Sequence, residues 1–308
     1  MFTATVGVRR RKGLTLPTEV CERIIDHVAR RSPKPNYSSA WASGTPETLK
    51  ACALTCKAWT ARSQWHLFHF LEVVCSSTSS QSLANFYALL DKHKTLVHKV
   101  EALRVQAGDR TMPTIHTISA RLPQLLHNIK ALTLSRGVLS PPPSPFFFAA
   151  MRQFRRVTKL TLWKMTFQSV HDLRHTICSL PALQVLNIFW PTWLKPHTSA
   201  LPGVYPLTKI QLQIVEVSAE AKWMQDSRSI YFMKWLVKSG ITASVKKAYF
   251  GNLMIINVKL LIVVASLILN CQKSLQTLSL SWGPDVDATL CKFIIIIMNV
   301  KDILCSLT

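Results

Sequence analysis

Short runs of alternating apolar and polar residues recur along the chain from about residue 100. Each run has an apolar residue, two spacers and then apolar-x-apolar, as in VTKLTL at residues 157–162. Alternation with a period of two predicts a β-strand with one buried face. Corresponding apolar positions fall at residues 103, 132, 160, 186, 210, 248 and 278. The pattern therefore predicts seven short strands, with the fifth over residues 207–212. A further strand is expected over residues 69–74.

Segments between these strands have a helical period, most clearly at residues 171–180 and 229–237. A strand followed by a helix leaves an apolar face that a neighbouring unit can cover. The steps between corresponding positions run from 24 to 38 residues and mostly lie near the period of leucine-rich repeats. We expect the units to stack with a parallel sheet. The alternative is a non-repeat α/β domain whose strands share their spacing by chance.

The first 70 residues predict helices. Pro17 suits a first helical turn, where its missing N–H costs nothing. Val20, Ile24 and Val28 follow at intervals of four, which gives one apolar stripe. A second helix is expected to begin near Thr45 and to continue toward the Cys-x-x-Trp sequence. Two helices of this length cannot bury all of their apolar surface alone, so another domain or a partner must cover it.

The Leu-Pro helix start at Leu16 and the Cys-x-x-Trp ending at Trp59 together resemble an F-box. The resemblance implies a small helical module that docks on a Skp-type adaptor and, through it, on a cullin. The residues that the resemblance assigns to adaptor binding are Leu16, Pro17, Val20, Ile24, Leu54, Cys56 and Trp59. Residues 30–46 depart from the family pattern, because F-boxes join these helices by a short link. Closure entropy grows slowly with loop length, so this insertion need not break the helix pair.

The irregular repeats resemble the degenerate leucine-rich repeats of fungal F-box proteins. The expected fold class is therefore mixed α/β, with a small all-helical F-box module followed by an irregular leucine-rich-repeat-like solenoid. Residues 1–13 are expected to form a basic disordered tail and residues 14–70 the helical module. Residues 71–288 are expected to form a leucine-rich-repeat-like domain that binds the substrate. Residues 289–308 are an apolar tail without the polar cap that a solenoid needs, and we interpret them as a truncated or atypical end.

The charge and the cysteine content of the chain indicate which binding partners and which cellular location to expect. The chain has 37 Lys and Arg against 15 Asp and Glu, a net charge of +22, which favours acidic partners. Its one dense basic run, residues 9–12, comes without a nucleic-acid-binding signature, so nucleic acid is not the expected partner. The eight cysteines do not form a disulfide scaffold, and no secretory signal is apparent. A cytoplasmic or nuclear location is expected.

The apolar tract at residues 253–269 raises the question of a membrane segment. It is shorter than a full span and contains Asn257 and Lys259. A buried helix between two strands explains the same residues, so no membrane partner is expected.

Enzyme motifs are missing from the sequence. There is no Gly-x-Ser-x-Gly elbow, phosphate-binding glycine loop, His-Glu-x-x-His site or paired-carboxylate motif. The histidines and cysteines have no zinc-ligand spacing. We expect no catalytic residue, metal or cofactor. Tryptophans follow several strands and are candidate substrate contacts, since tryptophan often anchors interfaces. A hydrophobic cap over neighbouring repeats is the commoner role for such residues. The candidates are Trp163, Trp190, Trp193 and Trp282.

Together these features predict the substrate-recognition subunit of an SCF-type ubiquitin ligase, with the catalytic chemistry on other subunits. One alternative is a leucine-rich-repeat interaction protein whose F-box is vestigial. Another is a basic protein that associates with nucleic acid or membranes. The target protein and its recognition signal are not readable from these patterns.

Overall fold

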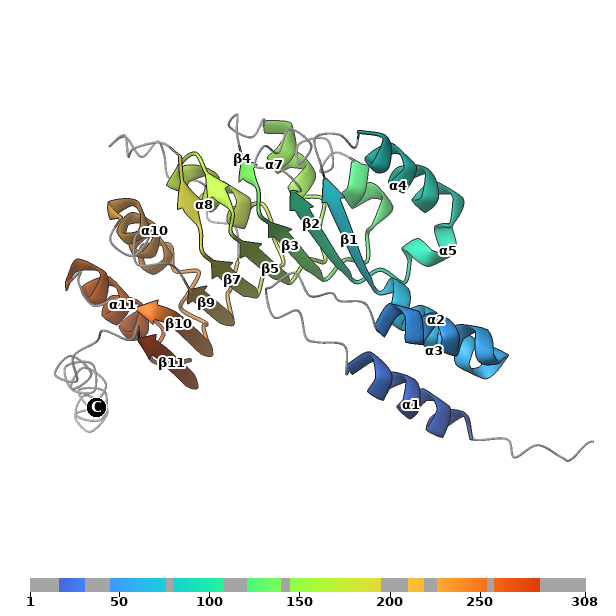
Figure 1. Ribbon diagram of the computed structural model, residues 1–308. Helices are drawn as coiled ribbons and strands as arrows, with labels where there is room; N and C mark the ends of the chain where they lie inside the picture. The colour runs from blue at the N-terminus through green and yellow to red at the C-terminus, as the bar shows by residue number, and fades with distance from the viewer. Residues whose placement is uncertain are drawn as a thin grey trace, which may run out of the picture. The chain divides into compact units, whose positions relative to one another are not determined.

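The computed structural model describes residues 17–30, 45–75, 80–107, 121–139, 145–194, 210–218, 226–253 and 258–282. The expected basic tail, Leu16, most of the 30–46 insertion and the apolar tail lie outside the described residues. The chain divides into two compact units (Figure 1), which we call the helical unit, Met1–His69, and the sheet unit, Phe70–Thr308.

The helical unit contains α1 (Thr18–Arg30), α2 (Thr45–Thr55) and α3 (Lys57–Phe68). The first helix begins where Pro17 predicts, because the Pro17 carbonyl accepts hydrogen bonds from the amides of Val20 (3.1 Å) and Cys21 (3.2 Å). The second predicted helix ends at Thr55, before the Cys-x-x-Trp sequence. Cys56 has extended backbone, with φ −160° and ψ 165°, and separates α2 from α3.

The sheet unit is built on eight parallel strands. They lie side by side in the order β1-β2-β3-β5-β7-β9-β10-β11. The order of the strands in the sheet is therefore the same as their order along the chain. Three two-residue strands, β4 (Val138–Leu139), β6 (Thr166–Phe167) and β8 (Thr192–Trp193), form a second parallel sheet. The eight large-sheet strands are β1 (Phe70–Cys75), β2 (Ala102–Ala107), β3 (Ala131–Ser135), β5 (Lys159–Trp163), β7 (Val185–Phe189), β9 (Ile214–Ser218), β10 (Lys247–Leu253) and β11 (Thr277–Trp282).

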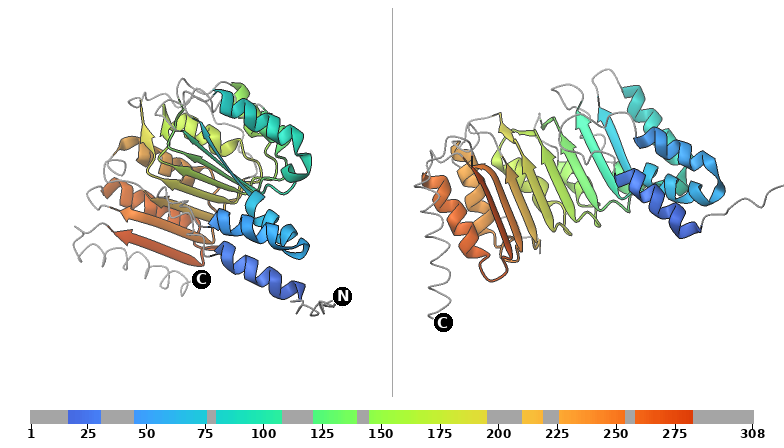
Figure 2. Two further views of the ribbon diagram at one scale, coloured as in Figure 1. Left: turned by 45° about the vertical axis from the view of Figure 1, so that its right-hand side comes forward. Right: turned by 60° about the horizontal axis from the view of Figure 1, so that its bottom comes forward.

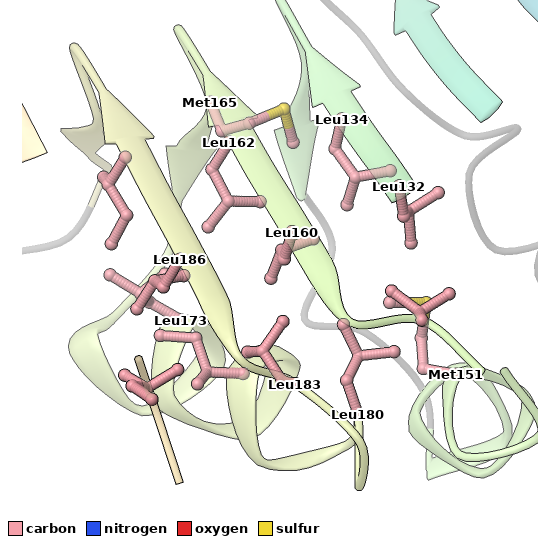
Figure 3. Packing of buried hydrophobic residues seen from close by; sticks show 14 of the residues in the cluster. Leu132, Leu134, Met151, Leu160, Leu162, Met165, Leu173, Leu180, Leu183 and Leu186 are labelled. Atoms are coloured by element: carbon pink, nitrogen blue, oxygen red, sulfur yellow. The ribbon is translucent and has the colours of Figure 1, made fainter. Parts of the chain in front are cut away.

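The helices of the sheet unit share one hydrophobic core with one face of the sheet (Figure 2). Leu132, Leu160 and Leu186 are in register on neighbouring strands and are buried. Leu173 and Leu180, from α8 and the turn after it, pack beside them (Figure 3). The contributing helices are α4 (Ser80–Lys92), α5 (Lys94–Val97), α7 (Pro145–Met151), α8 (Val170–Cys178), α10 (Ser227–Lys238) and α11 (Val258–Asn270). We call the opposite side of the sheet the second face.

Backbone hydrogen bonds fix the register where each strand begins. The amide of Lys130 donates to the carbonyl of Glu101 (2.7 Å), and that of Thr158 donates to the carbonyl of Lys130 (2.9 Å). The same bond recurs from Gln184 to Thr158 and from Gln213 to Gln184. Successive strands are therefore aligned one residue before the sheet itself starts.

The structure has mixed α/β content, but the expected fold class is wrong as stated, because the sheet unit is built around one large eight-stranded parallel sheet. A helical F-box module followed by an irregular leucine-rich-repeat-like solenoid does not describe it. The physical reason is that period-two alternation reports a strand and its buried face and carries no information on the wider architecture. Most individual strands, and the helices predicted at residues 171–180 and 229–237, are confirmed.

One strand is displaced from its predicted position. The fifth strand runs over Ile214–Ser218 and not over residues 207–212. Apolar residues alternate in one phase at positions 210, 212 and 214 and in the other phase at positions 215 and 217, so the local pattern allows more than one strand position. Pairing of Val185 with Ile214 selects the one that the structure has.

The apolar tract at residues 253–269 contributes α11, a helix of 13 residues. Val263, Val264 and Leu267 on this helix are buried in the core. Among the helices that the structure describes, none combines the length and apolar character needed to cross a bilayer.

Candidate functional site

The first helix has two apolar stripes with different surroundings. Cys21 and Ile25 are buried within the helical unit, whereas Val20 is 40% exposed and Ile24 39% exposed. Neighbouring residues of a helix point about 100° apart, so a stripe offset by one position faces a different direction. The exposed stripe is thus distinct from the stripe that holds the unit together.

A second exposed apolar position lies at the corner between α2 and α3. Leu54 is 87% exposed, and Cys56 is exposed beside it. The Thr60 hydroxyl lies between the carbonyls of Ala53 (2.8 Å) and Cys56 (3.0 Å) and donates toward both. This contact joins the two helices at the corner.

An ion-pair cluster joins α1 to α3. Arg62 donates to both carboxylate oxygens of Asp26, from Nε at 2.7 Å and from Nη2 at 2.9 Å. Nε2 of His66 lies 2.8 Å from the same carboxylate. Hydrogen bonding from Arg62, with a further contribution from His66, holds the pKa of Asp26 well below its usual range. Arg62 also lies 5.0 Å from the ring centroid of Trp65. We call Asp26, Arg62 and His66 the helix clamp.

The residues assigned to adaptor binding by the F-box resemblance are divided by burial. Pro17, Val20, Ile24, Leu54 and Cys56 are exposed, and we call them the apolar face of the helical unit. Trp59 is half-buried, and Leu16 lies outside the described residues. The sequence pattern could not distinguish the exposed stripe of α1 from the buried one, because both have the same period.

The sheet unit has an unusual backbone feature where three adjacent strands end. Arg136, Lys164 and Trp190 directly follow β3, β5 and β7 and have φ of 56°, 49° and 48°. The left-handed region costs a residue with a side chain about 1–2 kcal/mol. Each of these three amides donates to the last residue of the next strand at 2.8 Å, to the carbonyls of Trp163, Phe189 and Ser218 respectively. The sheet hydrogen bonding therefore extends one residue past the regular strands.

Aromatic rings gather at this end of the sheet. The Trp163 and Trp190 ring centroids are 4.2 Å apart with an interplanar angle of 87°, and Phe189 lies 5.4 Å from Trp163. Nζ of Lys164 is 5.3 Å from the Trp190 ring centroid. Trp163 and Phe189 are buried but do not belong to the core cluster under the helices. We call Arg136, Trp163, Lys164, Phe189 and Trp190 the aromatic edge.

The four candidate tryptophans have different surroundings. Trp163 is buried against Trp190, which is half-buried beside the exposed cation Lys164. Arg136, also exposed, follows the neighbouring strand β3. Trp193 packs against the core, and its Nε1 donates to the Ser229 hydroxyl at 3.5 Å. Trp282 ends β11, and its side chain lies outside the described part. The structure thus brings Trp163 and Trp190 together. Arg136 and Lys164, which sequence patterns did not single out, complete the cluster.

Polar residues form one row across the second face of the sheet. Thr161, Asn187 and Glu216 are in register on β5, β7 and β9. Burial raises the pKa of Glu216, an effect that the nearby Lys159 opposes. Oδ1 of Asn187 is buried, and within the described ranges it has no hydrogen-bond partner. This row lies next to the buried rings of the aromatic edge, since Asn187 and Phe189 are two residues apart on one strand.

Metal-ligating and titratable side chains are the remaining candidates for chemistry. No group of three or more His, Cys, Asp and Glu side chains there is placed to hold a metal ion. On α8, burial lowers the pKa of His175, which stacks on Phe148 at 3.6 Å between centroids. Burial raises the pKa of the Cys178 thiol on the same helix and so disfavours the reactive thiolate.

Comparisons with known proteins do not assign the chain to a family. No protein-family model matches it, and no curated protein does. Among solved structures, a mandelate racemase/muconate lactonizing enzyme from a marine actinobacterium matches with 12% identity and a TM-score of 0.19. That match covers 88% of this chain and 73% of the other. A similarity at this level carries no argument about fold or activity.

Proposed function

We propose that this chain is the substrate-recognition subunit of an SCF-type ubiquitin ligase in the cytoplasm or nucleus. The helical unit docks on a Skp-type adaptor, which links the chain to a cullin, and the sheet unit binds the target protein. The observation that carries the proposal is the exposure of Val20, Ile24 and Leu54. These are positions that the F-box resemblance assigns to adaptor binding.

The energetic argument starts from the cost of leaving large apolar side chains in water. Full burial of a Val, Leu or Ile side chain contributes about 1.5–3 kcal/mol. The helical unit already has its own interior, formed by Cys21, Ile25, Leu49 and Cys52. Burial of the apolar face against a partner would therefore stabilise the complex. A small cluster of such residues is enough to dominate an interface.

Co-purification with a Skp-type adaptor tests the proposal on the full chain. The variant Ile24→Lys/Leu54→Lys places two charges on the apolar face and should weaken adaptor binding by about 100-fold or more. The control is Leu89→Lys/Leu269→Lys, which changes two exposed leucines on α4 and α11; Leu89 is 55% exposed. The control should retain the adaptor. Equal losses in the two variants, or no adaptor bound by the wild-type chain, would overturn the proposal.

A second candidate is a protein-interaction module whose F-box-like start binds no adaptor. The observation that favours it is the long segment between Arg30, where α1 ends, and Thr45, where α2 begins. Folded wild-type chain that captures a target protein but no adaptor would select this candidate.

A further inference from the structure

The aromatic edge has two cations whose charge is not neutralised within the described part of the chain. Arg136 and Lys164 are exposed, and no carboxylate there lies within ion-pair distance of either. They follow paired strands, since Ser135 and Trp163 are in register. Neighbouring strands are about 4.8 Å apart, so the two side chains start from adjacent points on one edge.

The backbone at this edge is unfavourable for the residues it carries. Glycine adopts a left-handed conformation freely, whereas a bulky side chain such as that of Trp190 seldom does. Strained conformations persist where the surrounding structure fixes them, and they concentrate at functional sites. Here the strain accompanies an indole that stands perpendicular to Trp163 and beside the ammonium of Lys164.

Burial separates two roles within the aromatic edge. Trp163 and Phe189 are buried and pack around Trp190, so they act as positioning residues. Trp190 is half-buried, and with Arg136 and Lys164 it presents one indole and two cations to solvent. Tryptophan and arginine are the residue types most enriched among interface anchors.

We propose that the aromatic edge binds an acidic segment of a partner protein that also has an apolar side chain. Carboxylates of the segment pair with Arg136 and Lys164, while the apolar side chain packs against Trp190. The net charge of +22 attracts such a segment from a distance, and the local cations fix its position. That this partner is a ligase substrate rests on the proposed function. Binding of an acidic segment by the aromatic edge is independent of the proposed function.

Peptide binding by the full chain tests this inference. The probe is a fluorescein-labelled peptide of about twelve residues, rich in glutamate with one central phenylalanine, measured by anisotropy at physiological salt. Arg136→Gln/Lys164→Gln should weaken binding by about tenfold or more. The matched control, Lys234→Gln/Lys238→Gln on α10, removes the same charge and should change affinity by less than about twofold.

A third variant separates the indole from the charges. Trp190→Gly removes the ring and places glycine at a backbone position that glycine adopts without strain, so the variant should fold. We expect it to weaken binding of the phenylalanine peptide by about tenfold. A matched probe with serine in place of phenylalanine should lose less than about threefold on the same substitution.

Three results would overturn the inference. One is equal weakening by the two double variants, which would show general charge attraction. Another is no binding of the glutamate-rich probe by the wild-type chain. A third is tighter binding of a single-stranded oligonucleotide with the same dependence on Arg136, Lys164 and Trp190. Adaptor binding is measured in parallel. Arg136→Gln/Lys164→Gln should retain the adaptor, and Ile24→Lys/Leu54→Lys should retain the peptide, so failure of one proposal is distinguishable from failure of the other.

Discussion

Replacement of Asp26 by Asn should loosen the first helix without disturbing the sheet unit. The substitution keeps the size of the side chain but removes the charge that receives two hydrogen bonds from Arg62, at 2.7 and 2.9 Å. Hydrogen bonds to charged groups contribute about 1.5–3 kcal/mol when buried, whereas exposed ion pairs contribute about 0.2–1 kcal/mol. The side chain of Asp26 is 21% exposed and that of Arg62 35%, between these limits. We therefore expect a loss of about 1–2 kcal/mol.

Hydrogen exchange measured by mass spectrometry on the full chain is the suitable assay, because it reports local opening of each helix. A loss of this size should raise exchange of α1 amides about 5- to 30-fold, with α8 as the internal reference. Glu22→Gln, which removes an exposed carboxylate from the same helix, should change exchange by less than about twofold. Unchanged α1 exchange in Asp26→Asn, or an equal change in α8, would refute the assignment of the clamp.

The same clamp predicts a dependence on pH. The folded-state pKa of Asp26 is lowered from an ordinary value of 3.8, chiefly by the hydrogen bonds from Arg62. Its stabilisation is therefore complete above the ordinary pKa and is lost as the pH falls through the folded-state pKa. The exchange difference between wild type and Asp26→Asn should shrink as the pH falls below about 4. A constant difference below that pH would contradict the predicted linkage.

Three further predictions concern the sheet unit. Leu186→Ala, at a fully buried core position, should lower the free energy of unfolding in urea by about 2–5 kcal/mol. The control Leu194→Ala, at a half-exposed position, should lower it by less than about 1 kcal/mol. Equal losses in the two variants would contradict the core assignment. Trp190→Gly should be more stable than Trp190→Val by about 1–2 kcal/mol in the same assay, because valine at position 190 would still have the unfavourable left-handed backbone conformation. The opposite order of stability would contradict backbone strain at this position. Ser169→Ala removes the capping box of α8 and should cost about 1 kcal/mol by thermal unfolding; no change would show that Asp172 alone caps the helix.

Sequence patterns located strands well where turns interrupt the alternation. The strand Lys159–Trp163 is preceded by a turn and alternates cleanly, so its position could be predicted. The apolar phase changes at Ile214 and Val215, so the alternation allows two strand positions there, and pairing with β7 sets the register. The two-residue strands β4, β6 and β8 are too short to carry a periodic signal. The wider fold class was wrong, since strand spacing alone allows several architectures.

The candidate surfaces were predictable only in part. Residue types and order pointed to Ile24 and Leu54, but not to which stripe of α1 is exposed. Left-handed turns are recognised in sequences by glycine or asparagine. The positions after β3, β5 and β7 hold Arg136, Lys164 and Trp190 instead, so the turn chemistry that creates the aromatic edge leaves no local signal.

The agreement between strand order and chain order has a consequence for how this unit tolerates change. Each strand of the large sheet obtains its backbone partners from the strands that precede and follow it in that order. Connections between strands can lengthen at small entropic cost, because the paired ends stay the same. Segments inserted between strands would therefore change what the molecule presents to partners while leaving the sheet intact.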